Sequence, residues 1–271
     1  MPSSCNDDHD ETEGGDVAGY NRRAWDRQVD QGNRWTVPVD TQRIAAARRG
    51  DWSIVLTPER AVPRTWFPSL ANRRVLGLAC GGGQQAAILA AAGAHVTVLD
   101  NSPRQLEQDQ AVARREGLEI TTVLGDMRDL SQFDDRSFDV VVNPCSVSFV
   151  PNVSVVFREV ARVLEDQGVF MGGFINPAWF VFDEAGKEQG RLEVRHVLPY
   201  ADRSHLSRDE IAKILTAEEP LIFSHSLEEL LTGQMRVGLS IVDFYEDRPS
   251  GEIISRYMPS YFATLATKTD R

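Results

Sequence analysis

Short apolar runs of strand length recur along the first two thirds of the chain. They lie at residues 75–79, 96–99, 120–124, 139–142 and 169–174, and polar or helix-favouring sequence separates them. Runs of this length bounded by turn signals are typical of buried strands. Because the strands alternate with helical segments, the pattern predicts an α/β fold with a mainly parallel sheet.

Several of the intervening segments carry clear helix signals. Residues 84–92 have a helix-favouring composition and end at Gly93, and residues 102–105 form a capping box with proline in the first helical position. That second helix should continue to the residue before Gly117. Asn152 should cap a further helix whose apolar residues recur at helical spacing, namely Val153, Val156, Phe157, Val160, Val163 and Leu164.

The C-terminal third departs from this alternation. Aromatic-rich extended pieces are predicted at 176–182, 192–200 and 220–224, the last two on either side of a helix capped by Ser207 and Glu210. This stretch therefore does not continue the βα repeat of the core.

The end of the chain predicts one helix and two strands. Ser226 and Glu229 form a capping box before a helix at 227–231, and strands follow at 239–245 and 261–267. Because no helix separates the two strands, they are expected to form a hairpin instead of a further parallel βα unit.

The turn after the first strand has the chemistry of a nucleotide site. Gly81, Gly82 and Gly83 end the first apolar run, and Asp100 ends the second. Glycines allow close approach of a ligand to the backbone, and the following helix start offers free amide donors. A carboxylate at the tip of the next strand can accept hydrogen bonds from ribose hydroxyls. The separation of Gly81 and Asp100 is close to the spacing of about 20 residues at such sites.

Two families share this arrangement. Gly81-x-Gly83-x-x-Ala86 fits the dinucleotide fingerprint, so an NAD-dependent oxidoreductase is one interpretation. The longer stretch resembles motif I of the class I S-adenosylmethionine-dependent methyltransferases. The matching residues are Leu78-Ala79-Cys80-Gly81-Gly82-Gly83, Leu89-Ala90 and Ala94-His95-Val96-Thr97-Val98-Leu99-Asp100-Asn101-Ser102-Pro103. Gly77 and Ala79 depart from the family pattern, which commonly has Asp and Gly there. The expected C-terminal hairpin favours the methyltransferases.

The resemblance covers roughly residues 20–268 and implies a Rossmann-like fold. This fold has a seven-stranded, mostly parallel sheet with an antiparallel strand 7, helices on both faces and a small substrate-cap insertion. The expected units are an acidic disordered tail at 1–18, a helical lid and connection at 19–72, a cofactor-binding core at 73–175, the insertion at 176–225 and a closing helix and hairpin at 226–271. Trp25 and Trp35 in the lid segment either fold over the cofactor or merely pack against the sheet.

The implied reaction is in-line transfer of the methyl group of S-adenosylmethionine to a small molecule, which leaves S-adenosylhomocysteine. In the family, an Asp after strand three meets the adenine amino group and the next residue packs on the ring, roles that fall to Asp126 and Met127. Asn143, at the tip of strand four, would lie near the methionine end and the acceptor. The full expected cofactor site is Ala79, Gly81, Gly83, Gln84, Asp100, Asn101, Gln105, Asp126, Met127 and Asn143.

The acceptor and the accepting atom (O, N or S) are not identified by the sequence. Class I enzymes usually bind the acceptor with an insertion at the place that corresponds to residues 176–225 here. The resemblance therefore makes the polar residues of this segment candidates for acceptor binding or for a base. The candidates for catalysis are His196, Tyr200, Asp202 and Asn143, with His205 and His225 as further insertion residues. For each insertion residue taken alone, a structural hydrogen bond is favoured over catalysis. Cys145 could be a nucleophile, but it has no identifiable activating base and is expected to line a pocket.

Composition and charge limit the kinds of partner, and the location, that are expected for the chain. The net charge is −11, of which −6 belongs to residues 1–18, and this disfavours nucleic acid. No apolar stretch approaches a membrane span, and the N-terminus lacks a secretory signature, so a cytoplasmic monomer or homodimer is expected. Three widely spaced cysteines predict neither a metal site nor disulfides. A noncatalytic cofactor-binding scaffold is the remaining alternative.

Overall fold

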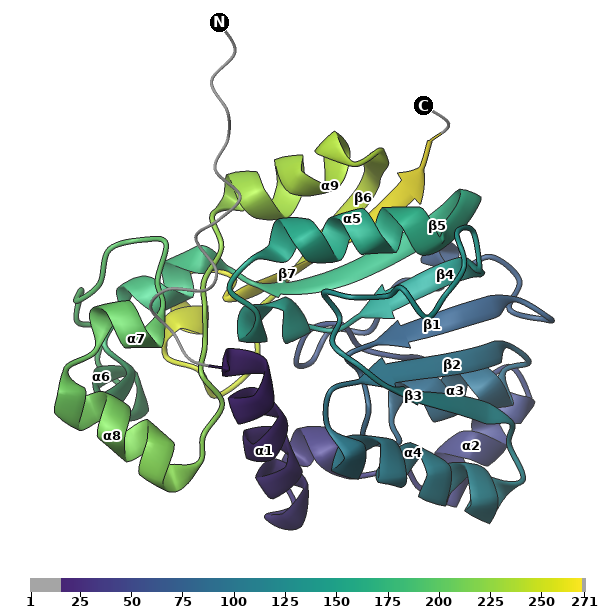
Figure 1. Cartoon of the computed structure of the whole chain (residues 1–271), viewed down its shortest axis with the longest axis horizontal. Helices are drawn as coiled ribbons and strands as arrows, with labels where there is room; N and C mark the ends of the chain where they lie inside the picture. The colour runs from purple at the N-terminus through teal and green to yellow at the C-terminus, as the bar shows by residue number, and fades with distance from the viewer. Residues whose placement is uncertain (1–15, 270–271) are drawn as a thin grey trace, which may run out of the picture.

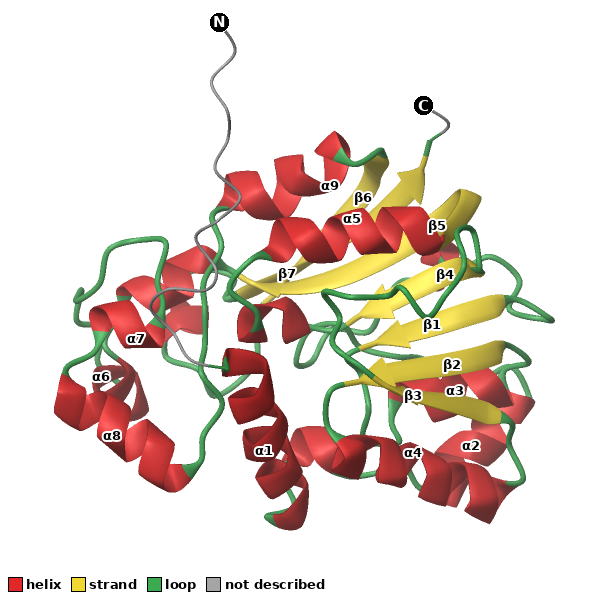
Figure 2. Cartoon of the chain, in the orientation of Figure 1, coloured by secondary structure: helices red, strands yellow, loops and turns green. Residues whose placement is uncertain are grey.

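A seven-stranded sheet forms the centre of the computed structural model, which describes residues 16–269 (Figures 1 and 2). The strand order is β3-β2-β1-β4-β5-β7-β6, and β7 runs antiparallel to both of its neighbours. The strands are β1 (Arg74–Leu78), β2 (His95–Asp100), β3 (Ile120–Leu124), β4 (Phe138–Asn143), β5 (Leu164–Ile175), β6 (Leu239–Asp247) and β7 (Tyr261–Lys268). The antiparallel β7 confirms the predicted fold and does not favour an oxidoreductase with continued βα units.

Helices cover both faces of the sheet. The helices are α1 (Val17–Asp30), α2 (Thr41–Arg48), α3 (Gln85–Ala91), α4 (Pro103–Glu116), α5 (Val153–Val163), α6 (Glu184–Glu188), α7 (Asp202–His205), α8 (Arg208–Ala217) and α9 (Gly233–Arg236). Side chains alternate along a strand, so Val75 of β1 packs with α3 on one face and Leu76 packs with α5 on the other. Two apolar cores therefore enclose β1 and fix its C-terminal end.

Most of the predicted core elements are confirmed, with one correction in β5. The helix capped by Asn152 buries its whole predicted stripe, and α4 begins after Ser102 and ends before Gly117. β5, however, begins five residues earlier than predicted, directly after α5. Leu164 already pairs with Phe138, and the ladder is irregular before pairing resumes at Val169.

The segment 176–225, called the cap below, packs beside the sheet (Figure 1). The predicted capping box of Ser207 and Glu210 is present at the start of α8. The predicted extended piece at 176–182 is wrong, because Pro177–Val181 forms a 3-10 turn whose start Asn176 caps. Next to the cap, the predicted helix at 227–231 is present as a π-helix, Glu228–Thr232, that continues into α9.

Helix α1 lies between the cap and the core, across the C-terminal ends of the strands (Figure 1). The Asn21 side chain joins both parts: its Nδ2 donates to the Phe149 and Leu221 carbonyls, and its Oδ1 accepts from the Leu221 amide. The helix begins at Val17 with Asp16 as its N-cap, so residues 16–18 do not belong to the predicted tail. The remainder of that tail, residues 1–15, and Cys5 lie outside the described residues.

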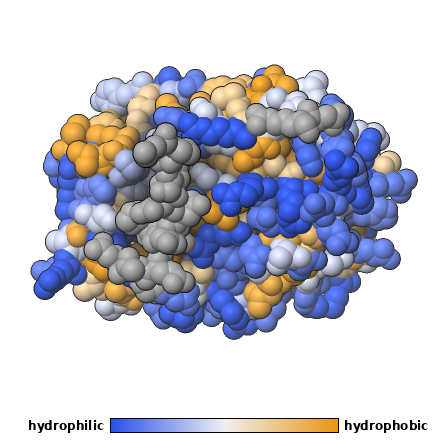
Figure 3. All heavy atoms as spheres, turned by 45° about the horizontal axis from the view of Figure 1, so that its top comes forward, coloured by the Kyte–Doolittle hydropathy of each residue, from blue (hydrophilic) through white to orange (hydrophobic). Residues whose placement is uncertain are grey.

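The surface in Figure 3 carries mostly hydrophilic side chains, and hydrophobic ones form separate areas between them. Within residues 16–269, no helix combines the length and apolar character that crossing a membrane requires. Over the same residues, no group of three or more His, Cys, Asp or Glu side chains could hold a metal ion.

Candidate functional site

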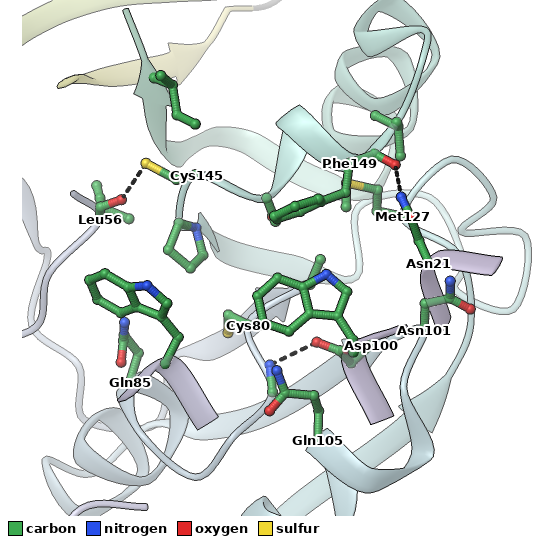
Figure 4. A pocket seen from close by; sticks show the side chains of 18 of the residues that line it. Asn21, Leu56, Cys80, Gln85, Asp100, Asn101, Gln105, Met127, Cys145 and Phe149 are labelled. Atoms are coloured by element: carbon green, nitrogen blue, oxygen red, sulfur yellow. Dashed lines mark hydrogen bonds between the residues drawn. The ribbon is translucent and has the colours of Figure 1, made fainter. Parts of the chain in front are cut away.

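A cavity of about 240 Å³ lies at the C-terminal edge of the sheet. Asp100, Asn101, Asp126 and Met127 line one end of it, called the Asp100 end. Leu56, Cys145, Ile175 and Tyr261 line the other, called the Tyr261 end. Figure 4 shows Cys145 and Leu56 across the opening from Asn101 and Met127. Because β7 is far from β2 in the sheet order, the cavity follows the edge over most of the sheet.

The glycine turn is held by two buried carboxylates. Asp100 at the tip of β2 accepts the Gly81 amide at 2.9 Å, and Asp109 on α4 accepts the amides of Gly82 and Gly83 at 3.0 and 3.1 Å. These three amides precede α3 (Gln85–Ala91), whose own first amides are the free donors that the sequence predicts. The amides of the turn already have acceptors inside the protein, and the turn contributes shape to the site.

Burial changes the acidity of both carboxylates. Desolvation raises the pKa of Asp100 to about 6, although amides of Ser102 and Gly81 oppose the shift. Desolvation, together with the neighbouring charge of Asp100, raises the pKa of Asp109 to about 8. At neutral pH, Asp109 therefore holds a proton and Asp100 is the ionised member.

The two departures from the family motif have local explanations. A side chain on Gly77 would meet the Sγ of Cys80 at 2.5 Å, so the buried thiol fills the space that a residue-77 side chain would need. Ala79 lies in the left-handed region with φ of 47°, a conformation that favours glycine. Ala79 and Cys80 both line the cavity.

The predicted cofactor-binding residues at the Asp100 end differ in how many partners they have within the protein. Asp126 forms a bidentate ion pair with Arg128, and Met127 is buried beside it. Gln105 lines the cavity, and its buried Oε1 has no hydrogen-bond partner. Ser102 accepts the Gln105 amide, but Gln105 does not return the bond, so the predicted capping box is only half formed.

Two of the predicted cofactor residues lie outside the cavity lining. Gly83 packs against α4, and Asn143 is fully buried below the lining. Asn143 donates to the Leu78 carbonyl and to the Ser146 hydroxyl, and its Oδ1 has no partner. It therefore fixes the β4 loop to β1 beneath the cavity. The other predicted cofactor residues all line the cavity, namely Ala79, Gly81, Gln84, Asp100, Asn101, Gln105, Asp126 and Met127.

The N-terminal segment closes the Asp100 end. Val17, Ala18, Asn21, Trp25 and Trp35 all contribute to the lining. The ring of Trp25 meets that of Phe149 edge-on at 5.0 Å.

Side chains of the core hold this segment in place. Gln84 donates to the carbonyls of Arg34 and Val37, and Asn101 donates to that of Ala18. Gln84 and Asn101, both predicted as cofactor residues, therefore also hold the N-terminal segment on the core.

The predicted catalytic residues of the cap do not reach the cavity. Tyr200 donates to Asp202 at 2.7 Å, and Asp202 also accepts the Ile222 amide. His196 packs against Tyr200 and His205, with ring centroids 4.9 and 6.0 Å apart. These residues stabilise the cap internally, and none lines the cavity. His225 contacts the Val147 carbonyl instead.

The Tyr261 end contains the remaining chemistry. Cys145 donates to the Leu56 carbonyl, and burial raises the pKa of its thiol, so it is neutral. Tyr261 lines the cavity and donates to Glu252 at 3.1 Å. Burial and the charge of Glu252 raise the pKa of this phenol above its usual range.

Sequence reasoning missed Asp109 and Tyr261. Asp109 could have been found, because its spacing from Leu106 and Val112 places it on the buried face of α4. Tyr261 carried no local signal: it begins an ordinary apolar strand, and its position follows from pairing with Ile175 of β5.

Comparisons with known proteins agree with this geometry. Residues 76–172 match the family model described as a methyltransferase domain. An uncharacterized methyltransferase of Bacillus subtilis (strain 168), YbaJ, is 47% identical over 252 residues, which cover 93% of this chain and 98% of that protein.

Solved structures share the fold. An S-adenosylmethionine-dependent methyltransferase from Mesorhizobium loti has a TM-score of 0.60 at 22% identity, covering 75% of this chain and 94% of its own. A 1,6-didemethyltoxoflavin-N1-methyltransferase from Burkholderia thailandensis, solved with 1,6-didemethyltoxoflavin and S-adenosylhomocysteine, has a TM-score of 0.56 at 16% identity, covering 100% and 93%.

Proposed function

This chain belongs to the class I S-adenosylmethionine-dependent methyltransferases, and from that premise we propose that it methylates a small, mainly apolar molecule bound at the Tyr261 end. The observation that carries the proposal is the cavity itself. It joins a nucleotide-type end at Asp100 to a second end lined largely by carbon, at Leu56, Ile175 and Tyr261.

The residues at the Asp100 end fit the cofactor. The buried Asp100 carboxylate faces the cavity, and the Gln105 Oε1 beside it has no partner within the protein. A Cβ added at Gly81 would lie 2.7 Å from the Gln105 Cβ, so only glycine at this position keeps the space beside Gln105 open. Asp100 would hold the ribose hydroxyls, and Asp126 and Met127 would hold the adenine amino group and ring.

When bound, S-adenosylmethionine supplies a methyl group that is already activated on a sulfonium. The chain then has to position the acceptor and exclude water. The N-terminal segment supports both tasks, because Trp25 and Trp35 cover the cavity and Gln84 holds Arg34 and Val37 down on the core. We propose that this segment is a lid that opens for cofactor exchange.

The proposed function can be tested by tracing a labelled methyl group from the cofactor to its acceptor. The protein is incubated with methyl-labelled S-adenosylmethionine and a cell extract that has been separated by size into small-molecule and macromolecular fractions. We expect label to enter the small-molecule fraction and to depend on intact Asp100. Label that enters only protein or nucleic acid would contradict a small acceptor. The cytoplasmic location and the monomer or homodimer state stay predictions.

A further inference from the structure

The Tyr261 end of the cavity contains a hydrogen-bonded pair of polar side chains, Tyr261 and Glu252, that the cofactor assignment does not use. We infer that Tyr261 and Glu252 form the binding and proton-accepting pair for the methyl acceptor, which is therefore an uncharged, mainly apolar molecule carrying N–H or O–H on its accepting atom. This inference rests on the proposed function and specifies its substrate class.

The position of Tyr261 is fixed by the sheet. It begins β7 and pairs with Ile175, the last residue of β5, and both line the cavity. Three strand spacings separate β7 from β1, about 14 Å at the usual spacing. Tyr261 thus lies on the side of the cavity away from Asp100 and on the acceptor side of the cofactor site.

Hydrogen bonds around Glu252 orient the phenol. Glu252 accepts from the Tyr261 hydroxyl at 3.1 Å and, through its other oxygen, from the Ser260 hydroxyl at 2.8 Å. Because the Tyr261 hydrogen is engaged by Glu252, the phenol oxygen can act toward a ligand only as a hydrogen-bond acceptor. A ligand atom that carries hydrogen satisfies it, and an ether or tertiary amine does not.

Neighbouring polar groups have partners of their own. The Cys145 thiol donates to the Leu56 carbonyl, the Thr57 hydroxyl donates to Tyr245, and the Ser146 hydroxyl accepts from Asn143. A buried ligand hydrogen without an acceptor costs stability, and the Tyr261 oxygen offers an acceptor at this end of the cavity.

The pair also completes the proton balance. As the bond from the accepting atom to the methyl carbon forms, the sulfur–carbon bond breaks and its electron pair stays on sulfur. The accepting atom then loses its proton to the Tyr261 oxygen, and Tyr261 passes its own proton to Glu252. Glu252 is only partly buried, so it can release this proton to water.

Charges surround the pair from several elements. The positive charge of Arg34, in the N-terminal segment, acts on the Tyr261 phenol. The negative charge of Glu252 acts on the Lys187 ammonium of α6. On the side of β4 and β6, the neutral Cys145 thiol and the charge of Asp247 of β6 also lie near the pair.

A pair of small probes tests the binding role in the S-adenosylhomocysteine complex. The probes are 4-methylphenol, which is neutral at pH 7, and 4-methylanisole, which lacks the hydroxyl hydrogen. We expect the wild type to prefer the phenol by about tenfold, the worth of one hydrogen bond near 1.4 kcal/mol. Tyr261→Phe should bring this ratio close to one. Tyr257→Phe is the control, because this tyrosine is 71% exposed and lies outside the cavity lining, and it should keep the ratio.

Substitutions of Glu252 separate orientation from proton transfer. Glu252→Gln still accepts from the phenol and should keep the probe ratio, while methyl transfer to the small-molecule fraction should fall at least a hundredfold. Glu252→Leu frees the Tyr261 hydrogen and should lower the ratio as well. Equal binding of the two probes by the wild type, or an unchanged ratio in Tyr261→Phe, would overturn the acceptor class. Wild-type transfer by Glu252→Gln would overturn the proton route.

The cofactor serves as the independent check. Calorimetric binding of S-adenosylhomocysteine should be the same in the wild type, Tyr261→Phe and Tyr257→Phe. If the wild type fails to bind it, the proposed function fails. If it binds while the probe ratio stays near one, only the Tyr261–Glu252 inference fails.

Discussion

Asp109 and Asp100 together accept all three amide hydrogens of the glycine turn, Asp109 those of Gly82 and Gly83 and Asp100 that of Gly81. Both carboxylates are buried, so neighbouring charges and burial disfavour two ionised forms at once. The proton is held by Asp109, on the helix, and the charge by Asp100, which lines the cavity. The arrangement leaves one negative charge where ribose hydroxyls would bind.

Asp109 should make the free energy of unfolding depend on pH. Its folded pKa is raised to about 8, so the folded state binds this proton more tightly than the unfolded state. The free energy of unfolding therefore falls as pH rises from about 4 to about 8, by up to 1.4 kcal/mol per pH unit. Asp109→Asn cannot ionise, so urea denaturation between about pH 6 and 8 should show a flatter dependence.

The control for this change lies on the same helix. Glu107→Gln alters an exposed carboxylate of α4 and should keep the wild-type pH dependence. If Asp109→Asn and the wild type differ by the same free energy at every pH in this window, Asp109 is not the titrating group.

Asp100 should control cofactor affinity. Replacement by Ala would also leave the Gly81 and Ser102 amides without an acceptor, so Asp100→Asn is the sharper variant. Loss of a charged hydrogen-bond acceptor should weaken S-adenosylhomocysteine binding by about ten- to hundredfold in calorimetry. In the wild type, affinity should also fall below about pH 6, where Asp100 gains a proton. Unchanged affinity in a folded Asp100→Asn variant would remove the ribose assignment.

Ala79 should be a site of stored backbone strain. Its φ of 47° is costly for alanine, by about 1 to 2 kcal/mol, and glycine regains part of this at an entropic cost in the unfolded chain. We expect Ala79→Gly to raise the free energy of unfolding by about 0.5 to 1 kcal/mol. Gly82→Ala is the opposite control, since its new Cβ would lie 3.0 Å from the Trp35 carbonyl. A destabilised Ala79→Gly variant would contradict this account.

Gln84 should govern how long the cofactor stays bound. Gln84→Ala removes the bonds to the Arg34 and Val37 carbonyls, and each is expected to contribute about 0.5 to 1.5 kcal/mol. If the N-terminal segment is a lid, stopped-flow release of S-adenosylhomocysteine should become several-fold faster, and hydrogen exchange over residues 31–40 should increase. Arg43→Ala on the exposed side of α2 should change neither. Unchanged release by Gln84→Ala would contradict the lid.

The parts of the molecule that the sequence could predict are those whose signals are local. An apolar run, a glycine turn and an acid nineteen positions later, Asp100, all fall within one βαβ unit. The Asn152 cap and the Gly117 stop likewise depend on neighbouring residues.

The parts that could not be predicted depend on contacts between distant residues. Asn21 joins to Leu221 across 200 positions, and Tyr261 reaches the cavity through strand pairing with β5. The cap candidates Tyr200 and Asp202 had the right chemistry, but they bond to each other away from the cavity. Residue type alone does not reveal which polar groups are already satisfied inside the fold.

A crystal structure of the S-adenosylhomocysteine complex tests the central claim most directly. The ribose is expected on the Asp100 carboxylate, the adenine beside Met127, and the sulfur directed toward Cys145 and Tyr261, with open space left at that end. Adenine bound at the Tyr261 end, or a cofactor bound outside this cavity, would contradict the account.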